Sequence, residues 1–159
     1  MKRSSLALLV VGLLVLASAG WAIAARLQAR KTDDAGTAKF EQMAMPMPNW
    51  LKSADAGVKE TYIWAAVHQE ELQYIPCYCG CGQMHDSNAA CFFKRREDGT
   101  IADYDSHALN CQICVEIARS VRQGLAQGKT LSAIRQQIDK TYQARGLVAT
   151  NTPMPPAGK

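Results

Sequence analysis

Residues 76–91, PCYCGCGQMHDSNAAC, constrain this chain more than any other segment. They contain four of its six cysteines, and Cys77, Cys79 and Cys81 occupy every second position. Alternate side chains of an extended segment share one face, so these three sulfurs can converge. A disulfide within a Cys-x-Cys pair would close a small, strained ring. Each thiol therefore needs a distant cysteine, a soft metal ion or a reacting thiol as its partner.

The other two cysteines, Cys111 and Cys114, are spaced i, i+3 near the start of a predicted helix. Amide groups at a helix N-terminus stabilise thiolates, which suits both a metal site and a redox dithiol. We expect these two sulfurs to face the Cys-x-Cys-x-Cys segment within about 4 Å across a shared core. His85 and His107 each follow or precede a cysteine group, and neutral imidazole completes thiolate sites for zinc or copper. The candidate metal ligands are Cys77, Cys79, Cys81, Cys91, Cys111, Cys114, His85 and His107.

The N-terminal part of the sequence predicts export. Residues 6–25 contain no charged side chain, and roughly 20 apolar residues are enough to cross a bilayer as a helix. Lys2 and Arg3 precede this run and favour a cytoplasmic N-terminus. Small-x-small sites at Ala17 and Ala22 also permit cleavage. Residues 1–26 are therefore a signal anchor or a signal peptide, and the rest is extracytoplasmic, either anchored to the cytoplasmic membrane or secreted.

Three further parts follow this segment. Residues 27–49 form a linker that contains methionine and proline, residues 50–146 a cysteine-rich domain, and residues 147–159 a tail without periodicity that we expect to be disordered. Met43, Met45 and Met47 alternate in the linker. Their thioethers either rest on the domain or contribute soft ligands suited to Cu(I).

The predicted fold is mainly α with a small β-hairpin, a compact cysteine-rich helical domain that follows an N-terminal membrane segment. Apolar periodicity predicts helices over residues 53–69, 108–127 and 131–143, with Asp55 or Ser53 as the first N-cap and Thr130 as the last. Asp98-Gly99 predicts a two-residue turn between strands at 91–95 and 100–104. A domain of this size buries a modest core and often needs cross-links or a metal ion.

Several motifs of the domain resemble a known family. IPCYCGCG at residues 75–82, Cys91, YDSH at 104–107 and CQIC at 111–114 resemble the bacterial exported proteins named for their Pro-Cys-Tyr-Cys-Gly-Cys motif. That resemblance implies a small lipoprotein or membrane-tethered protein of undefined function, although no cysteine for lipid attachment closely follows the apolar run. A shorter, gapped similarity, at residues 79–81, 86–89 and 121–142, is to the small thiol-redox subunit of bacterial cytochrome c maturation.

Three functions remain open from the sequence. Export first favours disulfides, but the crowding of the thiols favours a soft-metal-binding protein, with copper ahead of zinc because of the Met-containing linker. A membrane metalloprotein or a metal exporter is the expected partner. The alternatives are a thiol–disulfide redox protein that handles apocytochrome or other thiols, and a disulfide-stapled structural or interaction domain. A net charge of +4 without a basic, aromatic-rich run argues against nucleic acid, and no hydrolase or transferase motif is present.

Overall fold

The computed structural model describes residues 38, 40–41, 45–82 and 84–158. This part of the chain is mainly helical, with one antiparallel two-stranded hairpin, as the sequence predicts. The elements are α2 Asn49–Lys52, α3 Ala56–Val67, α4 Gln69–Leu72, the 3₁₀ turn η1 Ala89–Cys91, β1 Phe93–Arg95, β2 Ile101–Tyr104, the 3₁₀ turn η2 His107–Leu109, α5 Gln112–Ala126 and α6 Leu131–Gln143. Within these residues, none of the helices is long and apolar enough to cross a bilayer. The predicted membrane segment at residues 1–26 lies outside them, as does Met43.

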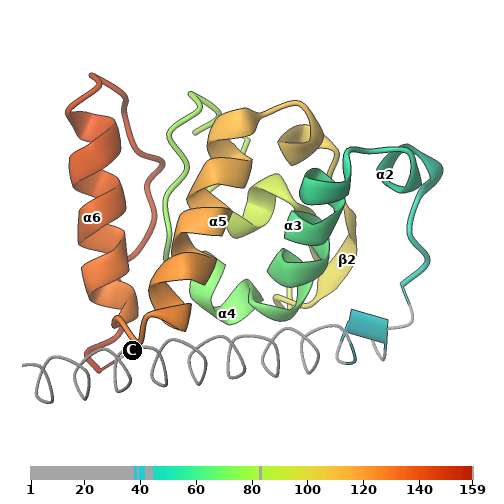
Figure 1. Ribbon diagram of the computed structural model, residues 1–159, viewed down its shortest axis with the longest axis horizontal. Coiled ribbons are helices and arrows are strands. Elements are labelled where there is room, and N and C mark those ends of the chain that lie inside the picture. Colours follow the sequence, from blue (N-terminus) through green and yellow to red (C-terminus); the bar gives the residue numbers. More distant parts are fainter. Residues whose placement is uncertain (1–37, 39, 42–44, 83, 159) are drawn as a thin grey trace, which may run out of the picture. The chain divides into compact units, whose positions relative to one another are not determined.

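Helix α5 lies between α6 on one side and α3 on the other (Figure 1). Its predicted apolar stripe is confirmed, since Cys114, Ala118 and Val121 are fully buried. Gly124 allows α6 to approach closely, because an added Cβ there would lie 2.5 Å from Cγ1 of Ile134. The predicted α6 is also confirmed, and its N-cap Thr130 accepts a hydrogen bond from the backbone N–H of Ala133. The pair α5–α6 packs against the segment of Cys77, Cys79 and Cys81, since Cys114 of α5 contacts Cys77 and Tyr142 of α6 stacks on Tyr78.

An aromatic cluster fills the other side of α3. The buried Tyr62 ring contacts Phe92 edge-on, with ring centroids 4.9 Å apart, and it also contacts Trp50 and Phe93. Such edge-to-face pairs are favoured by the ring quadrupoles. The Tyr62 hydroxyl donates a 2.7 Å hydrogen bond to the backbone oxygen of Asp105. The core is thereby tied to the turn that precedes His107.

Two predicted helices begin or end elsewhere. Helix α3 begins at Ala56, with Asp55 accepting hydrogen bonds from the backbone N–H groups of Gly57 and Val58, and it ends at Val67 instead of continuing to residue 69. Helix α5 begins at Gln112 instead of residue 108, since residues 107–109 form the separate turn η2. Cys111 adopts an extended N-cap conformation, with φ −114° and ψ 95°, which breaks the helical register between the two turns.

The hairpin is confirmed, but its predicted two-residue turn is wrong. The N–H of Gly99 bonds to the oxygen of Arg96, so Glu97 and Asp98 are the central residues of the turn. Gly99 follows with φ +81°, a left-handed conformation that glycine adopts without steric cost. The register then shifts between Lys94 and Arg95. The Asp98 carboxylate, which accepts from the N–H and hydroxyl of Thr100, favours this longer turn.

The terminal segment also differs from the expected disordered tail. Residues 147–158 form no helix or strand, but Thr150 pairs with Cys77: its N–H donates to the Cys77 oxygen, and its hydroxyl accepts from the Cys77 N–H, both at 2.9 Å. Thr152 donates to the backbone oxygen of Asp86. Hydrogen bonds of this kind are invisible to periodicity, since Thr150 and Thr152 act as single side chains and not as one face of a regular element. Residues 147–158, called the clasp below, thus fasten the loop of residues 76–82, called the cysteine loop.

Deletion of residues 147–159 is therefore expected to lower the free energy of unfolding of the metal-free domain by about 2–4 kcal/mol, because it leaves buried backbone groups of Cys77 unpaired. Deletion of residues 156–159 alone is the matched control, since Ala157 and Gly158 are exposed, and it is expected to change stability by less than about 0.5 kcal/mol. Urea denaturation of both truncated proteins measures the difference. Equal stability would contradict the clasp.

Candidate metal centre

The cysteine segment forms a tight loop beneath the clasp. Gly80 turns the chain with φ +82°, between the sulfurs of Cys79 and Cys81, which lie 2.9 Å apart. The Sγ of Cys77 lies 3.2 Å from that of Cys79. All six cysteines are free thiols, and these separations are well beyond the roughly 2.05 Å of a disulfide bond. Cys77 and Cys81 are buried, whereas Cys79 is half-buried.

The N-terminus of α5 brings the second pair of thiols to this loop. Cys114, in the first turn of α5, is fully buried with its Sγ 3.3 Å from that of Cys77 and 3.7 Å from that of Cys79. Cys111 is half-buried, 3.1 Å from Cys114 between sulfurs. The predicted meeting of the two cysteine groups within about 4 Å is confirmed by the Cys77–Cys114 distance.

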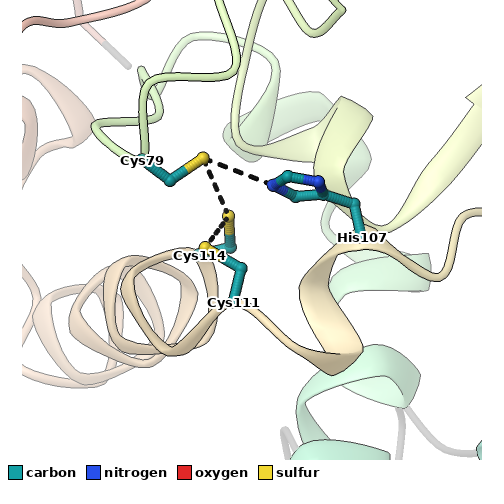
Figure 2. A group of neighbouring side chains, drawn as sticks. All are labelled: Cys79, His107, Cys111 and Cys114. Atoms are coloured by element: carbon teal, nitrogen blue, oxygen red, sulfur yellow. Dashed lines mark hydrogen bonds between the residues drawn. The ribbon is translucent and has the colours of Figure 1, made fainter.

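His107 completes a first ligand group. Its Nε2 lies 3.3 Å from the Sγ of Cys79, and Figure 2 shows the imidazole and three thiols pointing toward one another. The four ligand atoms all lie within 4.8 Å of one another; they belong to Cys79, His107, Cys111 and Cys114. They come from three separate segments, the cysteine loop, η2 and the start of α5.

A second ligand group lies next to the first and shares His107 with it. Its members, all within 4.8 Å of one another, are Cys81, His85, Cys91 and His107. The rings of His85 and His107 meet edge-on with centroids 4.6 Å apart. Cys91 is fully buried, and its thiol donates a weak bond to the Ser87 oxygen at 3.7 Å. The structure thus brings all eight sequence-predicted ligands to adjoining positions.

His85 is oriented as a ligand would be. Its side chain is 10% exposed, and its Nδ1 is buried without a hydrogen-bond partner among the described residues. Its Nε2 faces the Asp105 carboxylate at 3.9 Å, and the same carboxylate accepts from the backbone N–H of His107 at 2.8 Å. Carboxylates commonly orient metal-binding histidines in this way. Asp105 therefore faces the His85 imidazole and fixes the backbone of His107.

Burial and mutual hydrogen bonding set the protonation states of the site. Hydrogen bonds from Cys114 and Cys91 hold the pKa of Cys77 well below its usual value. The bond to Cys77 raises the pKa of Cys114, and burial raises those of Cys79 and Cys81. Burial, followed by the neighbouring His107, lowers the pKa of His85. These shifts favour negative charge on Cys77 over Cys79, Cys81 and Cys114, and the neutral form of the His85 imidazole.

The donor set fits a soft metal ion. Four ligand atoms that surround one ion tetrahedrally at about 2.3 Å lie about 3.8 Å from one another. The ligand atoms of the first group lie at most 4.8 Å apart, so they would move by roughly an ångström at most to bind an ion. Thiolate sulfur and imidazole nitrogen are the ligands of zinc and copper in proteins. A buried imidazole nitrogen without a partner is also costly unless something binds it.

Three supporting residues were not identified from the sequence. Asp105 lies two residues before His107. An acidic residue so close to a candidate histidine ligand is a local signal from which its supporting role could have been predicted. Arg135 and Thr150 gave no such signal, because they reach the cysteine loop only through the tertiary fold. Tyr78, a residue of the motif, also contacts α6, because its hydroxyl donates a hydrogen bond to the Asp139 carboxylate at 2.7 Å. Burial and this carboxylate raise the pKa of Tyr78 to about 12.

Comparison with known proteins gives one match. A family model described as a protein of unknown function with a PCYCGC motif matches residues 10–155. No curated protein and no solved structure matches the chain.

Proposed function

We propose, for a chain that belongs to the family of proteins of unknown function with a PCYCGC motif, that the reduced domain binds a soft metal ion. The observation that carries the proposal is the convergence of three thiols and one imidazole from three separate chain segments within 4.8 Å of one another; they are Cys79, His107, Cys111 and Cys114. Structural disulfides alone would not need a histidine in this position. A metal site can use one, because imidazole completes the coordination of an ion that is held by three thiolates.

We propose Cu(I) as the bound ion, with zinc as the alternative. Sulfur atoms outnumber imidazoles by six to two among the eight ligands, and all-sulfur triads such as Cys77, Cys79 and Cys81 suit the preference of Cu(I) for soft thiolates. Zinc is supported by the number and kind of ligands in the first group, three thiols and one imidazole. The linker methionines give no additional support, since Met45 and Met47 are partly buried against the hydrophobic core.

We further propose that the apolar run at residues 6–25 tethers the domain on the extracytoplasmic side of the membrane or directs its secretion. The supporting observation is the absence of charge in that run, after Lys2 and Arg3. A tethered thiolate site would be placed to deliver metal to a membrane metalloprotein, or to receive it from an exporter. Loss of membrane association in a fractionation experiment with residues 6–25 deleted would test the tether.

Anaerobic titration tests metal binding directly. The fully reduced protein is titrated with Cu(I) in competition with a chromogenic Cu(I) chelator, and in parallel with Zn(II). We expect near-stoichiometric uptake of Cu(I) against the chelator, and displacement of Zn(II) by Cu(I). Protein that is isolated without reductant and contains three complete disulfides and no metal would refute the proposal.

Metal binding at pH 7 is also expected to release protons. Burial raises the pKa values of Cys79 and Cys81, so both thiols are protonated in the metal-free site and must lose their protons to coordinate. Affinity should therefore rise with pH through the neutral range and fall on acidification. Isothermal titration calorimetry in two buffers of different ionisation enthalpy measures the protons released. Proton-neutral binding would contradict coordination by these thiols.

One observation favours a second function. Cys111 is the N-cap of α5 and half-buried, whereas Cys114 is buried 3.1 Å away between sulfurs. An accessible thiol at a helix N-terminus beside a buried one is the arrangement of a redox dithiol. The pair would pass two electrons and two protons to a disulfide acceptor and become a disulfide itself. A reversible couple that is unchanged by metal chelators would favour this function over metal binding.

A further inference from the structure

We infer that the cysteine centre holds two metal ions in two sites of the same composition, each with three thiolates and one imidazole. This inference rests on the proposed metal-binding function and specifies its stoichiometry and ligands. The first site consists of Cys79, Cys111, Cys114 and His107, and the second of Cys77, Cys81, Cys91 and His85.

The two ligand groups share His107. A neutral imidazole has one free nitrogen lone pair and binds one ion, so neutral His107 cannot serve as the fourth ligand of both groups. His107 belongs with the first group, because its Nε2 lies 3.3 Å from Cys79. The second group then has Cys81, His85 and Cys91, and it lacks a fourth ligand.

Cys77 supplies that ligand. Its Sγ lies within 4.8 Å of the Sγ of Cys81 and within 4.8 Å of the Sγ of Cys91, and the last two are equally close to each other. The three sulfurs therefore form a triad, and two of them, those of Cys81 and Cys91, also lie within 4.8 Å of a His85 ring nitrogen. The eight ligands can thus be divided into two sets of four, with every cysteine of the chain used once.

His85 provides independent support for the second site. The first site does not use it, yet its Nδ1 is buried without a partner, and the side chain is held beside the Asp105 carboxylate. Cys91 is likewise fully buried, in hydrogen-bonding contact with Cys77 and with a weak bond to the Ser87 oxygen at 3.7 Å. A second ion would bind the His85 nitrogen and the Cys91 sulfur. A single ion in the first site would bind neither of them.

The two sites are adjacent and unequal in access. Cys77 lies 3.2 Å from Cys79 and 3.3 Å from Cys114 between sulfurs, so its thiolate is also placed to bridge the two ions. Three ligands of the first site are half-buried, whereas all three sulfurs of the second are buried. A chelator should therefore remove the ion of the first site faster than the ion of the second site.

Counting ions by native mass spectrometry tests the inference on the full reduced chain. Zn(II) is the probe, because its preference for four ligands ties each ion to one set. We expect two Zn(II) in the wild-type protein, one in Cys111→Ser and one in Cys91→Ser. The single ion of Cys91→Ser, held by the accessible site, should be extracted by a chelator faster than that of Cys111→Ser.

The outcomes separate the inference from the function on which it rests. One Zn(II) in the wild-type protein, or two retained by Cys91→Ser, would overturn the second site while metal binding stands. Uptake of neither Zn(II) nor Cu(I) by the reduced protein would overturn the proposed function itself. A Co(II) titration needs no variant and guards against misfolding: its thiolate charge-transfer absorbance should rise to two equivalents, and a break at one would count against the second site.

Discussion

Simultaneous replacement of Cys91 and Cys114 by serine is expected to lower the affinity of the reduced domain for Cu(I) by more than about 100-fold, since changes of groups around metal ligands alone cost about 10–100-fold. The pair removes one fully buried sulfur from each ligand group. Serine keeps nearly the same shape but offers a hard hydroxyl, which binds soft ions poorly. Competition with a Cu(I) chelator measures the loss.

A matched control replaces two potential ligands that lie outside both groups. Met84 is 72% exposed, and His68 stacks on Trp64 with ring centroids 4.2 Å apart, on the C-terminal side of α3. His68→Ala/Met84→Ala is therefore expected to bind Cu(I) as the wild-type protein does. Circular dichroism checks that the serine variant is folded, and the corresponding alanine variant serves if it is not. Unchanged Cu(I) affinity in a folded Cys91→Ser/Cys114→Ser protein would show that these thiols are not ligands.

Replacement of Arg135 by methionine is expected to destabilise the metal-free domain by about 2–4 kcal/mol, because the half-buried Asp139 carboxylate and two backbone oxygens lose this donor. Arg135 is 6% exposed. Its guanidinium contacts both carboxylate oxygens of Asp139 and donates to the backbone oxygen of Tyr74 at 2.6 Å and to that of Pro153 at 3.2 Å. Arg135 of α6 thus connects the residues just before the cysteine loop with the clasp.

Two further variants sharpen this test. Arg135→Lys keeps the charge but cannot satisfy several acceptors at once with a planar fork, so we expect it to recover only part of the loss. Arg145→Met is the control: Arg145 is exposed and lies over the Tyr142 ring at 5.5 Å, and it should contribute about 1 kcal/mol or less. Urea denaturation with reductant and chelator present gives the three values. Equal midpoints for Arg135→Met and Arg145→Met would contradict the role of Arg135.

Local patterns predicted much of the fold and the whole set of candidate ligands. The stripe that contains Cys114, Ala118 and Val121 specifies a buried helix face, and Thr130 marks the start of α6, because both depend on residues close in sequence. The approach of the two cysteine groups was predictable as well. A buried helix face that carries thiols must pack against something, and the cysteine loop is the other part of the chain rich in soft ligands.

What the sequence did not predict depends on contacts between distant residues. The start of α5 at Gln112 follows from the turn η2, which Tyr62 ties to the core through Asp105. The clasp depends on Thr150 meeting Cys77 across 73 positions, and no local periodicity encodes that meeting. The division of eight ligands into two sets likewise requires distances, because spacing alone leaves Cys77 equally suited to either one.

The clasp has a consequence for how the protein is made. A chain emerges N-terminal end first, so the thiols of the cysteine loop appear before α5, and α5 appears before Thr150 reaches Cys77. During that interval the six thiols are uncovered in succession, and export would expose them to oxidants before their native neighbours arrive. Biogenesis is thus the stage at which wrongly paired disulfides would form. Under the proposed export, a reductant or a metal donor that acts during translocation would protect the thiols more than one that acts on the finished domain.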